Sequence, residues 1–229
     1  RVFNGTTLQE TASTKLWDDL DPMVFDPQRN LLFTESGGGD LHQNFSHFTT
    51  IDPRTMKVVN DLPIDGTTLE WMQLAKNGPQ IYLNNRARDM VTVVDRGKHA
   101  VVANWPIQGA HTNVAMAYDP AGHLIFVGCR SGQMVVLDTR NGKQIASEPL
   151  GPNVDDMVYD PASHRIYAAT DGNIDVFSMT SPERYSRVEV KSAKMGKTAL
   201  LVPSLRRYYV AVPQDGNTPA EILVYRVND

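Results

Sequence analysis

Hydrophobic and polar residues alternate along most of the chain in short runs, which is typical of half-buried β-strands. Four segments share one pattern of apolar strand, polar turn and aromatic-containing strand: MVFDPQRNLLFTE from Met23, MAYDPAGHLIFVG from Met116, MVYDPASHRIYAA from Met157 and, more loosely, ALLVPSLRRYYVA from Ala199. A fifth segment, QLAKNGPQIYLNN from Gln73, fits after deletion of one turn residue. The pattern therefore predicts an internal repeat built from β-strands.

The repeat has a regular period. The aromatic residue of the second strand recurs about every 43 residues, at Phe33, Tyr82, Phe126, Tyr167 and Tyr209. A third strand follows in each repeat (FTTID, VTVVD, MVVLD, IDVFS, ILVYR), and Asp52, Asp95 and Asp138 end three of these strands. A fourth strand comes next, such as KVVNDLPI or AVVANWPI. Four antiparallel strands per repeat of this length predict an all-β fold, a β-propeller of four-stranded blades.

The repeats also predict the domain organisation. The predicted blades span approximately residues 19–66, 67–110, 111–152, 153–196 and 197–229. The last repeat stops after its third strand, whereas the N-terminal VFNGTTLQETAS has the pattern of the end of a third strand followed by a fourth. We therefore expect a single domain, 1–229, with five blades, in which residues 1–18 supply the closing strand and remove an open sheet edge. The alternative is a fragment of a seven-bladed propeller. If whole blades were missing, the strand pattern at the two ends of the chain would be the same.

Composition narrows the range of functions. The chain has 229 residues, of which 41% are hydrophobic and 21% charged, so it can bury a sizeable core. Its formal net charge of −4 lacks the basic excess expected of a nucleic-acid-binding protein. No apolar run approaches the roughly 18 residues of a membrane span. The sequence contains no serine elbow, HExxH, CxxC, phosphate loop or dinucleotide fingerprint, so it points to no familiar enzyme class.

Two long segments carry a resemblance to a known family. YDPAGHLIFVGCRSGQMVVLDTRNGKQIASEPL and VYDPASHRIYAATDGNIDVFSMTSPERY resemble the YVTN family of bacterial β-propeller repeat proteins, which includes YncE-like proteins and has a WD40-like repeat architecture. The resemblance covers essentially residues 19–213. It implies an exported protein, periplasmic or extracellular, and no particular activity. Family members usually look seven-bladed, so this chain differs from them in length.

The predicted fold indicates where a ligand would bind. In a propeller, the loops that enter the first strands and the loops that join second to third strands lie on one face around the central channel, where ligands tend to bind. The predicted ligand-binding residues on this face are Asp21, Glu70, Trp71, Arg86, His111, Asn113, Arg130, Asp155 and Lys197. Converging carboxylates raise one another's pKa and suit acid–base chemistry. Polar loop residues that are merely solvated, or that hold water, are the alternative.

The stretch SGGGDLHQNFSH, residues 36–47, is interpreted as an enlarged surface loop that partly covers the channel mouth, with a metal site as the alternative. His42 and His47 are five positions apart in a glycine-rich loop, and a metal would need further ligands, with Asp40 nearby in sequence and His111 on another blade. A divalent cation held by His42, His47 and His111 is the one cofactor that the sequence suggests. Cys129 lies at the end of a second strand, where a buried thiol is favoured over an activated nucleophile.

Three functions follow from these observations, and no catalytic residue is assigned. The favoured one is an exported propeller that acts as a binding or interaction scaffold for a partner protein or a small polar ligand at the channel face. The first alternative is a metal-assisted hydrolase or lactonase with its site at the channel mouth, where Asp21, Glu70, His111 or Asp155 would hold the cation. The second alternative is a propeller subunit of a larger redox or surface complex.

Overall fold

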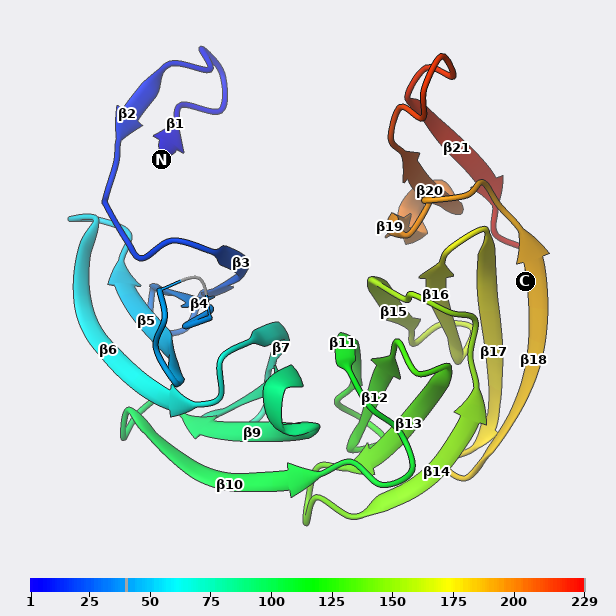
Figure 1. Ribbon diagram of the computed structural model, residues 1–229, viewed down its shortest axis with the longest axis horizontal. Helices are drawn as coiled ribbons and strands as arrows, with labels where there is room; N and C mark the ends of the chain where they lie inside the picture. The colour runs from blue at the N-terminus through cyan, green and yellow to red at the C-terminus, as the bar shows by residue number, and fades with distance from the viewer. Residues whose placement is uncertain (40, 229) are drawn as a thin grey trace. The chain divides into compact units, whose positions relative to one another are not determined.

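The computed structural model describes residues 1–39 and 41–228, and its regular secondary structure is almost entirely antiparallel β-sheet (Figure 1). The described residues include two short 3₁₀ helices, η1 (Arg86–Arg88) and η2 (Pro203–Leu205). None of the described helices is long and apolar enough to cross a membrane. The strong β-pattern of the sequence is therefore confirmed along the described chain.

Four repeats each form a four-stranded sheet in which every strand pairs with its neighbours in sequence. The first sheet contains β3 (Leu20–Asp26), β4 (Leu31–Ser36), β5 (Phe45–Asp52) and β6 (Lys57–Asp65). The second contains β7 (Leu69–Leu74), β8 (Gln80–Asn85), β9 (Met90–Asp95) and β10 (Ala100–Pro106). The third contains β11 (Asn113–Asp119), β12 (Leu124–Cys129), β13 (Gln133–Asp138) and β14 (Gln144–Pro149). The fourth contains β15 (Asp156–Asp160), β16 (Arg165–Thr170), β17 (Asn173–Ser181) and β18 (Arg184–Lys191).

The last repeat and the N-terminal residues form smaller sheets. The described residues of the last repeat form three strands, β19 (Thr198–Val202), β20 (Arg207–Val212) and β21 (Glu221–Arg226). Near the N-terminus, β1 (Val2–Phe3) pairs with β2 (Glu10–Ala12) in a two-stranded sheet of their own. The Asn4 side chain accepts the backbone N–H groups of Thr6 and Thr7, both at 2.9 Å, and so fixes the turn of this hairpin. The closing role of residues 1–18 and the count of five blades stay predictions.

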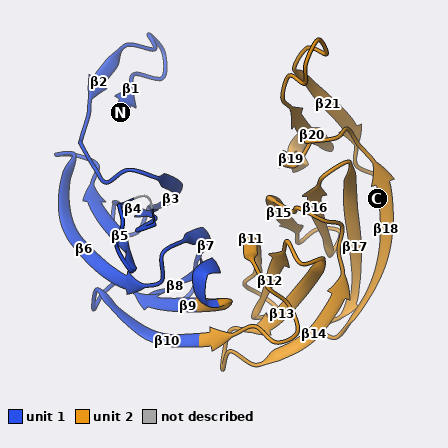
Figure 2. Cartoon of the chain, in the orientation of Figure 1, with its two compact units in different colours: residues 1–88, 92–104 blue, residues 89–91, 105–229 orange. Residues whose placement is uncertain are grey.

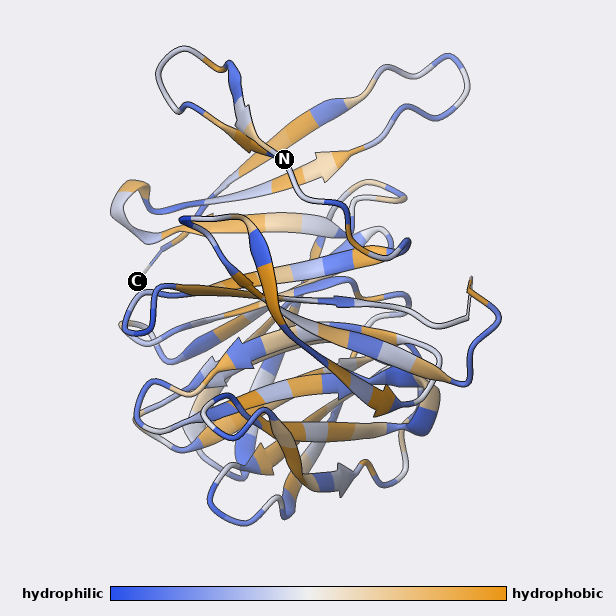
Figure 3. Ribbon diagram, turned by 90° about the vertical axis from the view of Figure 1, so that its left-hand side faces the viewer, coloured by the Kyte–Doolittle hydropathy of each residue, from blue (hydrophilic) through white to orange (hydrophobic). Residues whose placement is uncertain are grey.

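The chain divides into two compact units, residues 1–88 with 92–104 (unit 1) and residues 89–91 with 105–229 (unit 2) (Figure 2). In unit 1, side chains of the first and second sheets form one buried apolar cluster, which includes Phe33, Phe48, Leu69 and Met72. Among the described residues of unit 2, one such cluster lies between the third and fourth sheets and another lies between the fourth and fifth. Apolar and polar residues alternate along many of the strands (Figure 3), so burial of the apolar faces between successive sheets holds each unit together.

The recurrent aspartates of the repeat have a structural role at the turns. Asp26, Asp119 and Asp160 each end a first strand, and one carboxylate oxygen of each accepts a backbone N–H two residues later at 2.9–3.1 Å. Asp52, Asp95 and Asp138 do the same at the end of a third strand. Such side-chain turns satisfy backbone N–H groups where the sheet hydrogen bonds end. The regular spacing of these acids therefore reflects the fold.

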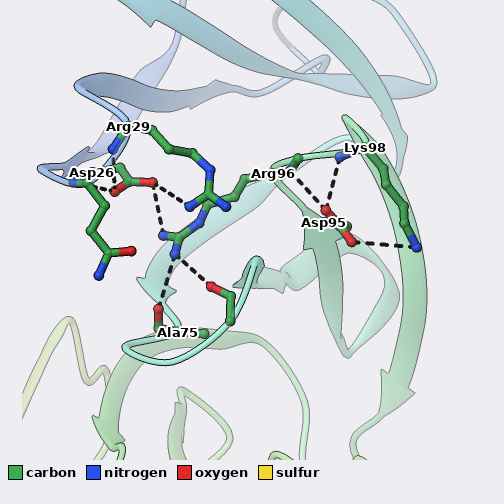
Figure 4. Close-up of polar contacts among 9 residues, drawn as sticks. Asp26, Arg29, Ala75, Asp95, Arg96 and Lys98 are labelled. Carbon is green, nitrogen blue, oxygen red and sulfur yellow. Dashed lines mark hydrogen bonds and ion pairs between the residues drawn. The ribbon is translucent and has the colours of Figure 1, made fainter.

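One of these turns forms a buried ion pair between the two sheets of unit 1 (Figure 4). The Asp26 carboxylate lies 3.2 Å from the Arg96 guanidinium, and the two side chains are 1% and 3% exposed. Arg96 also donates to the Gly78 carbonyl at 2.7 Å, and Arg29 contacts the same carboxylate of Asp26 at 3.3 Å. The contacts lie at the turns that join first to second and third to fourth strands. The opposite ends of these strands carry the candidate site.

Candidate functional site

An acidic cluster lies in unit 1 where β4 ends and where β3 and β7 begin. Asp21 and Glu70 are the second residues of β3 and β7. In each strand the pairing register shifts directly after this point, between Leu20 and Met23 and between Leu69 and Met72. A β-bulge of this kind redirects side chains at the end of a sheet. We call the group formed by Asp19, Asp21, Glu35 and Glu70 the Glu35 cluster.

Glu35 is the central residue of this cluster. It lies on β4 opposite Phe48 of β5, and it is only 1% exposed. Within the described chain, neither oxygen of its carboxyl group has a hydrogen-bond partner. Burial raises the pKa of Glu35 from 4.5 to about 9, and the charges of Asp21, Glu70 and Asp19 add to the rise. The carboxyl group is therefore protonated at neutral pH and lies in a negative field.

An ion pair lies beside the Glu35 cluster. The Arg86 guanidinium lies 2.9 Å from the carboxylate of Glu70, which is itself buried. Arg86 is the first residue after β8, so its position depends on the end of that strand and on η1. A Cβ atom on Gly37 would collide with the Asp19 carboxylate, and one on Gly38 would collide with the Phe45 carbonyl. Two residues of the glycine run are therefore explained by close approach.

In unit 2 the structure brings three of the predicted site residues together. Asp155 accepts a hydrogen bond from Arg130, and its other oxygen lies 2.7 Å from the Lys197 Nζ. All three side chains are partly buried. Arg130 follows β12, Asp155 precedes β15 and Lys197 precedes β19, so the network connects three successive sheets. Each charge of this network therefore already faces an opposite one, and a ligand-binding role for these three residues stays a prediction.

His111 and Asn113 connect the start of β11 to Asp89 and to the first residue of β9. The His111 Nδ1 lies 2.9 Å from the Asp89 carboxylate, whose other oxygen accepts the backbone N–H of Thr112 at 2.7 Å. The Asn113 side-chain amide donates to the Met90 carbonyl at 3.0 Å, and Asn113 is fully buried. The His111 side chain itself is exposed. Trp71, next to Glu70, is also exposed and presents an aromatic surface to solvent.

His47 belongs to a hydrogen-bonded group on the first sheet. Its Nδ1 lies 2.8 Å from the Asp61 carboxylate, and its Nε2 lies 2.9 Å from the Gln43 side-chain oxygen. The Trp17 ring stacks on the imidazole at 4.2 Å between centroids and donates its indole N–H to Asp61. Thr49 donates to the other Asp61 oxygen at 3.0 Å. A cavity of about 540 Å³ lies beside these residues and is lined by Trp17, Thr49 and Asp61 among others.

These contacts do not favour the predicted metal site. Both ring nitrogens of His47 already have partners. His42 is exposed, with a left-handed backbone (φ 56°), and Asp40 lies outside the described residues. Among the residues described, no group of three or more His, Cys, Asp or Glu side chains is placed to hold a metal ion. The divalent cation at His42, His47 and His111 stays a prediction.

Cys129 is a buried thiol. It lies at the end of β12 and is fully buried. Burial raises the pKa of its thiol to about 12, and the charge of Asp89 adds to this. A thiol in this state carries almost no thiolate at neutral pH, so it is a poor nucleophile. The structure supports the interpretation of Cys129 as a packing residue.

Glu35 was missed by the sequence reasoning, although the repeat contains a signal for it. The aligned second strands are LLFTES, QIYLNN, LIFVGC, RIYAAT and RYYVAV. Their fifth position is occupied by Glu35, Asn84, Gly128, Ala169 and Ala211, and Glu35 is the one ionisable residue among them. The other four repeats have a small or amide side chain at this position, so the ionisable side chain of Glu35 differs from the pattern of the repeat. Such a difference is the signal that could have identified Glu35.

Comparison with known proteins identifies the class of fold. No family model and no curated protein matches the chain. A chain in the crystal structure of the mitotic checkpoint complex is similar with a TM-score of 0.70 and 16% identity, over 87% of this chain and 60% of that one. A chain of Kuenenia stuttgartiensis hydrazine synthase is similar with a TM-score of 0.72 and 17% identity, over 96% of this chain and 67% of that one.

The protein is therefore a β-propeller protein, as the repeat predicted. At these identities the two similar structures support the fold alone. The chain spans 60% of the length of the checkpoint-complex chain and 67% of the hydrazine synthase chain. The resemblance to the YVTN family remains a resemblance, since no family model matches.

Proposed function

We propose that the protein is a β-propeller binding scaffold that holds a small polar ligand at the Glu35 cluster, without catalysing its conversion. The observation that supports this is the buried carboxyl group of Glu35, which has no hydrogen-bond partner in the described chain. A buried polar group without a partner costs about 1–3 kcal/mol. Retention of such a group at the loop end of the sheets is explained by a ligand that supplies the missing partner.

A thermal-shift screen tests this proposal. Small polar compounds of three classes, organic cations, organic anions and neutral sugars, are added to the wild-type protein and to Glu35→Gln and Glu70→Gln variants. We expect at least one class to raise the Tm of the wild type and to lose most of this effect in both variants. The exposed Glu183→Gln on the turn before β18 is the matched control and should behave as wild type. Stabilisation that persists unchanged in both cluster variants would exclude this site.

The location of the protein is part of the proposal. The resemblance of residues 19–213 to the YVTN family supports an exported protein, periplasmic or extracellular. Cell fractionation of the full-length protein in its native host, followed by immunoblotting, tests this location. Recovery in the cytosolic fraction alone would contradict it.

A second candidate function, as a subunit of a larger complex, is favoured by the last sheet of unit 2. Leu200, Ile222 and Val224 are all more than half exposed. Their partners in the sheet place them on one face, since Leu200 and Val224 both pair with Tyr209. The equivalent residues of the fourth sheet, which pack against the fifth, are Val158, Ile174 and Val176. We propose that a second polypeptide covers this face with an apolar β-sheet.

Mass measurement by light scattering and pull-down from native extract tests this second function. The variant Leu200→Ser with Val224→Ser should lose a partner that the wild type retains. Mass spectrometry should identify this partner, and circular dichroism of the purified partner should show that it is rich in β-sheet. A wild-type protein that stays monomeric, and that co-purifies with no partner sensitive to these substitutions, would contradict the proposal.

A further inference from the structure

The Glu35 cluster has an excess of negative charge. Its four members are all acids, and Asp19, Asp21 and Glu70 each act on Glu35 through their charges. Arg86 offsets the charge of Glu70 at 2.9 Å. Within the described residues Glu35 forms neither an ion pair nor a hydrogen bond. A cation is the ligand that best compensates such a group, because it satisfies the carboxyl oxygens and the surrounding field together.

On the basis of the proposed binding function, we propose that the Glu35 cluster binds the ammonium group of an organic amine, with Glu35 as its buried acceptor. An ammonium group has three N–H donors and a compact charge. Asp21, Glu35 and Glu70 lie on three different strands of unit 1, and the charges of Asp21 and Glu70 both act on Glu35.

The same observations argue against a metal ion at this position. Metal ions of the Mg²⁺ or Ca²⁺ type need several oxygen ligands within about 2.0–2.6 Å. The described part of the chain has no group of three or more His, Cys, Asp or Glu side chains placed to coordinate a metal. Hydrogen bonds from an ammonium group span longer distances, about 2.7–2.9 Å between heavy atoms. An ammonium group therefore does not need the close convergence of ligands that a metal ion requires.

Binding of the ammonium group changes the protonation of Glu35. In the free protein the buried carboxyl group is neutral at neutral pH, because its pKa is about 9. The positive charge of the ligand favours the ionised carboxylate, so the proton leaves Glu35 for the solvent as the charge-assisted hydrogen bond forms. The ligand keeps its own protons, and no covalent bond changes. Proton release is a signature that a merely structural Glu35 would not produce.

Isothermal titration calorimetry with n-butylammonium chloride tests the inference. Titrations at neutral pH in two buffers with different ionisation enthalpies give the number of protons released. We expect about one proton per bound ligand in the wild type. The Glu35→Gln variant keeps the size of the side chain but has no proton to release, so we expect no release and roughly tenfold weaker binding. Glu183→Gln, in an exposed turn, should match the wild type.

A second titration with N-acetyl-lysine amide distinguishes the source of the ammonium group. Equal proton release with both probes would support a free amine as ligand, and release with the lysine derivative alone would support a lysine side chain of a partner. Butylammonium and lysine titrations that both lack proton release in the wild type, or that are unchanged by Glu35→Gln, would overturn the inference. In that case, an increase in Tm caused by sugars or anions, and lost in Glu70→Gln, would still support the proposed binding function.

Discussion

At the scale of single residues, the described acids differ in their contacts. Several of them stabilise turns or form ion pairs, whereas Glu35 does neither. The turn aspartates satisfy backbone N–H groups, and Asp155 is paired with Arg130 and Lys197. Glu35 has no comparable partner in the described chain and is almost completely buried. A carboxyl group in this state lowers stability, and this makes it the clearest functional candidate among the acids.

The titration of Glu35 predicts a particular pH dependence of stability. Its pKa is raised from 4.5 to about 9 in the folded protein. Between these two pH values the folded state holds one more proton than the unfolded state. The contribution of Glu35 protonation to stability is therefore fully present below pH 4.5. As the pH rises from 4.5 toward about 9, the free energy of unfolding falls by about 1.4 kcal/mol per pH unit.

Glu35→Gln should remove this contribution. Thermal unfolding of the variant and the wild type across pH 4 to 9 should give similar Tm values at the acidic end, followed by an increasing advantage of the variant as the pH rises. Glu183→Gln provides the control for general charge effects. A Tm difference between Glu35→Gln and wild type that does not change with pH would show that Glu35 has an ordinary pKa.

The residue scale also shows what the sequence could reveal about the site. Asp21, Glu70, Arg86, Arg130, Asp155 and Lys197 were predicted at the loop ends of the strands. The structure places the first three in or beside the Glu35 cluster and the last three in a separate network of ion pairs. Which of these residues form ion pairs depends on the distances between residues on different sheets. The sequence pattern of a single repeat gives no information on these distances. Glu35 was overlooked because it lies within a strand and not in a loop.

At the scale of secondary-structure elements, a buried ion pair connects the turns of the two sheets of unit 1. Asp26 and Arg96 are each at most 3% exposed, and Arg96 also holds the Gly78 carbonyl. Removal of one partner leaves a buried charge uncompensated. Loss of one partner of the Asp26–Arg96 pair should therefore destabilise these turns more than loss of an exposed ion pair on the same sheets.

Arg96→Met should destabilise unit 1 substantially. The substitution removes the charge while keeping much of the side-chain volume, and it leaves Asp26 with Arg29 as its remaining cation. We expect a loss of about 3–5 kcal/mol in the free energy of unfolding, measured by urea denaturation. Arg54→Met, which breaks the exposed pair with Asp52, should have no measurable effect. Equal stability of the two variants would contradict the structural role of Arg96.

The loop between β4 and β5 offers a second test at this scale. A Cβ atom on Gly38 would collide with the Phe45 carbonyl oxygen, whereas one on Gly5 would meet open space. We expect Gly38→Ala to cost about 1–3 kcal/mol, because the backbone of the loop must move. Gly5→Ala is the matched control and should leave the Tm nearly unchanged. A tolerated Gly38→Ala would mean that the loop adopts another conformation.

At the scale of the whole molecule, the sequence predicted the fold class well because each repeat repeats the same β-pattern. Strand identity and turn position depend on local alternation and on turn residues, which are visible in a single sequence. The first four repeats form the predicted four-stranded sheets. In VFNGTTLQETAS, β1 pairs with β2 in a separate two-stranded sheet, and the assignment of this segment to the last blade stays a prediction. Blade number depends on long-range closure, which local pattern does not specify.

The central claim is that the Glu35 cluster is an ammonium-binding site whose buried acid is neutral until the ligand arrives. The most direct test is an NMR titration of the side-chain carboxyl carbons in ¹³C-glutamate-labelled protein, with Glu35 assigned by the Glu35→Gln variant. We expect the Glu35 signal to titrate near pH 9 in the free protein and to become that of an ionised carboxylate at neutral pH when n-butylammonium is bound. A Glu35 signal that titrates near its ordinary value of 4.5, or that stays protonated at saturating ligand, would contradict it.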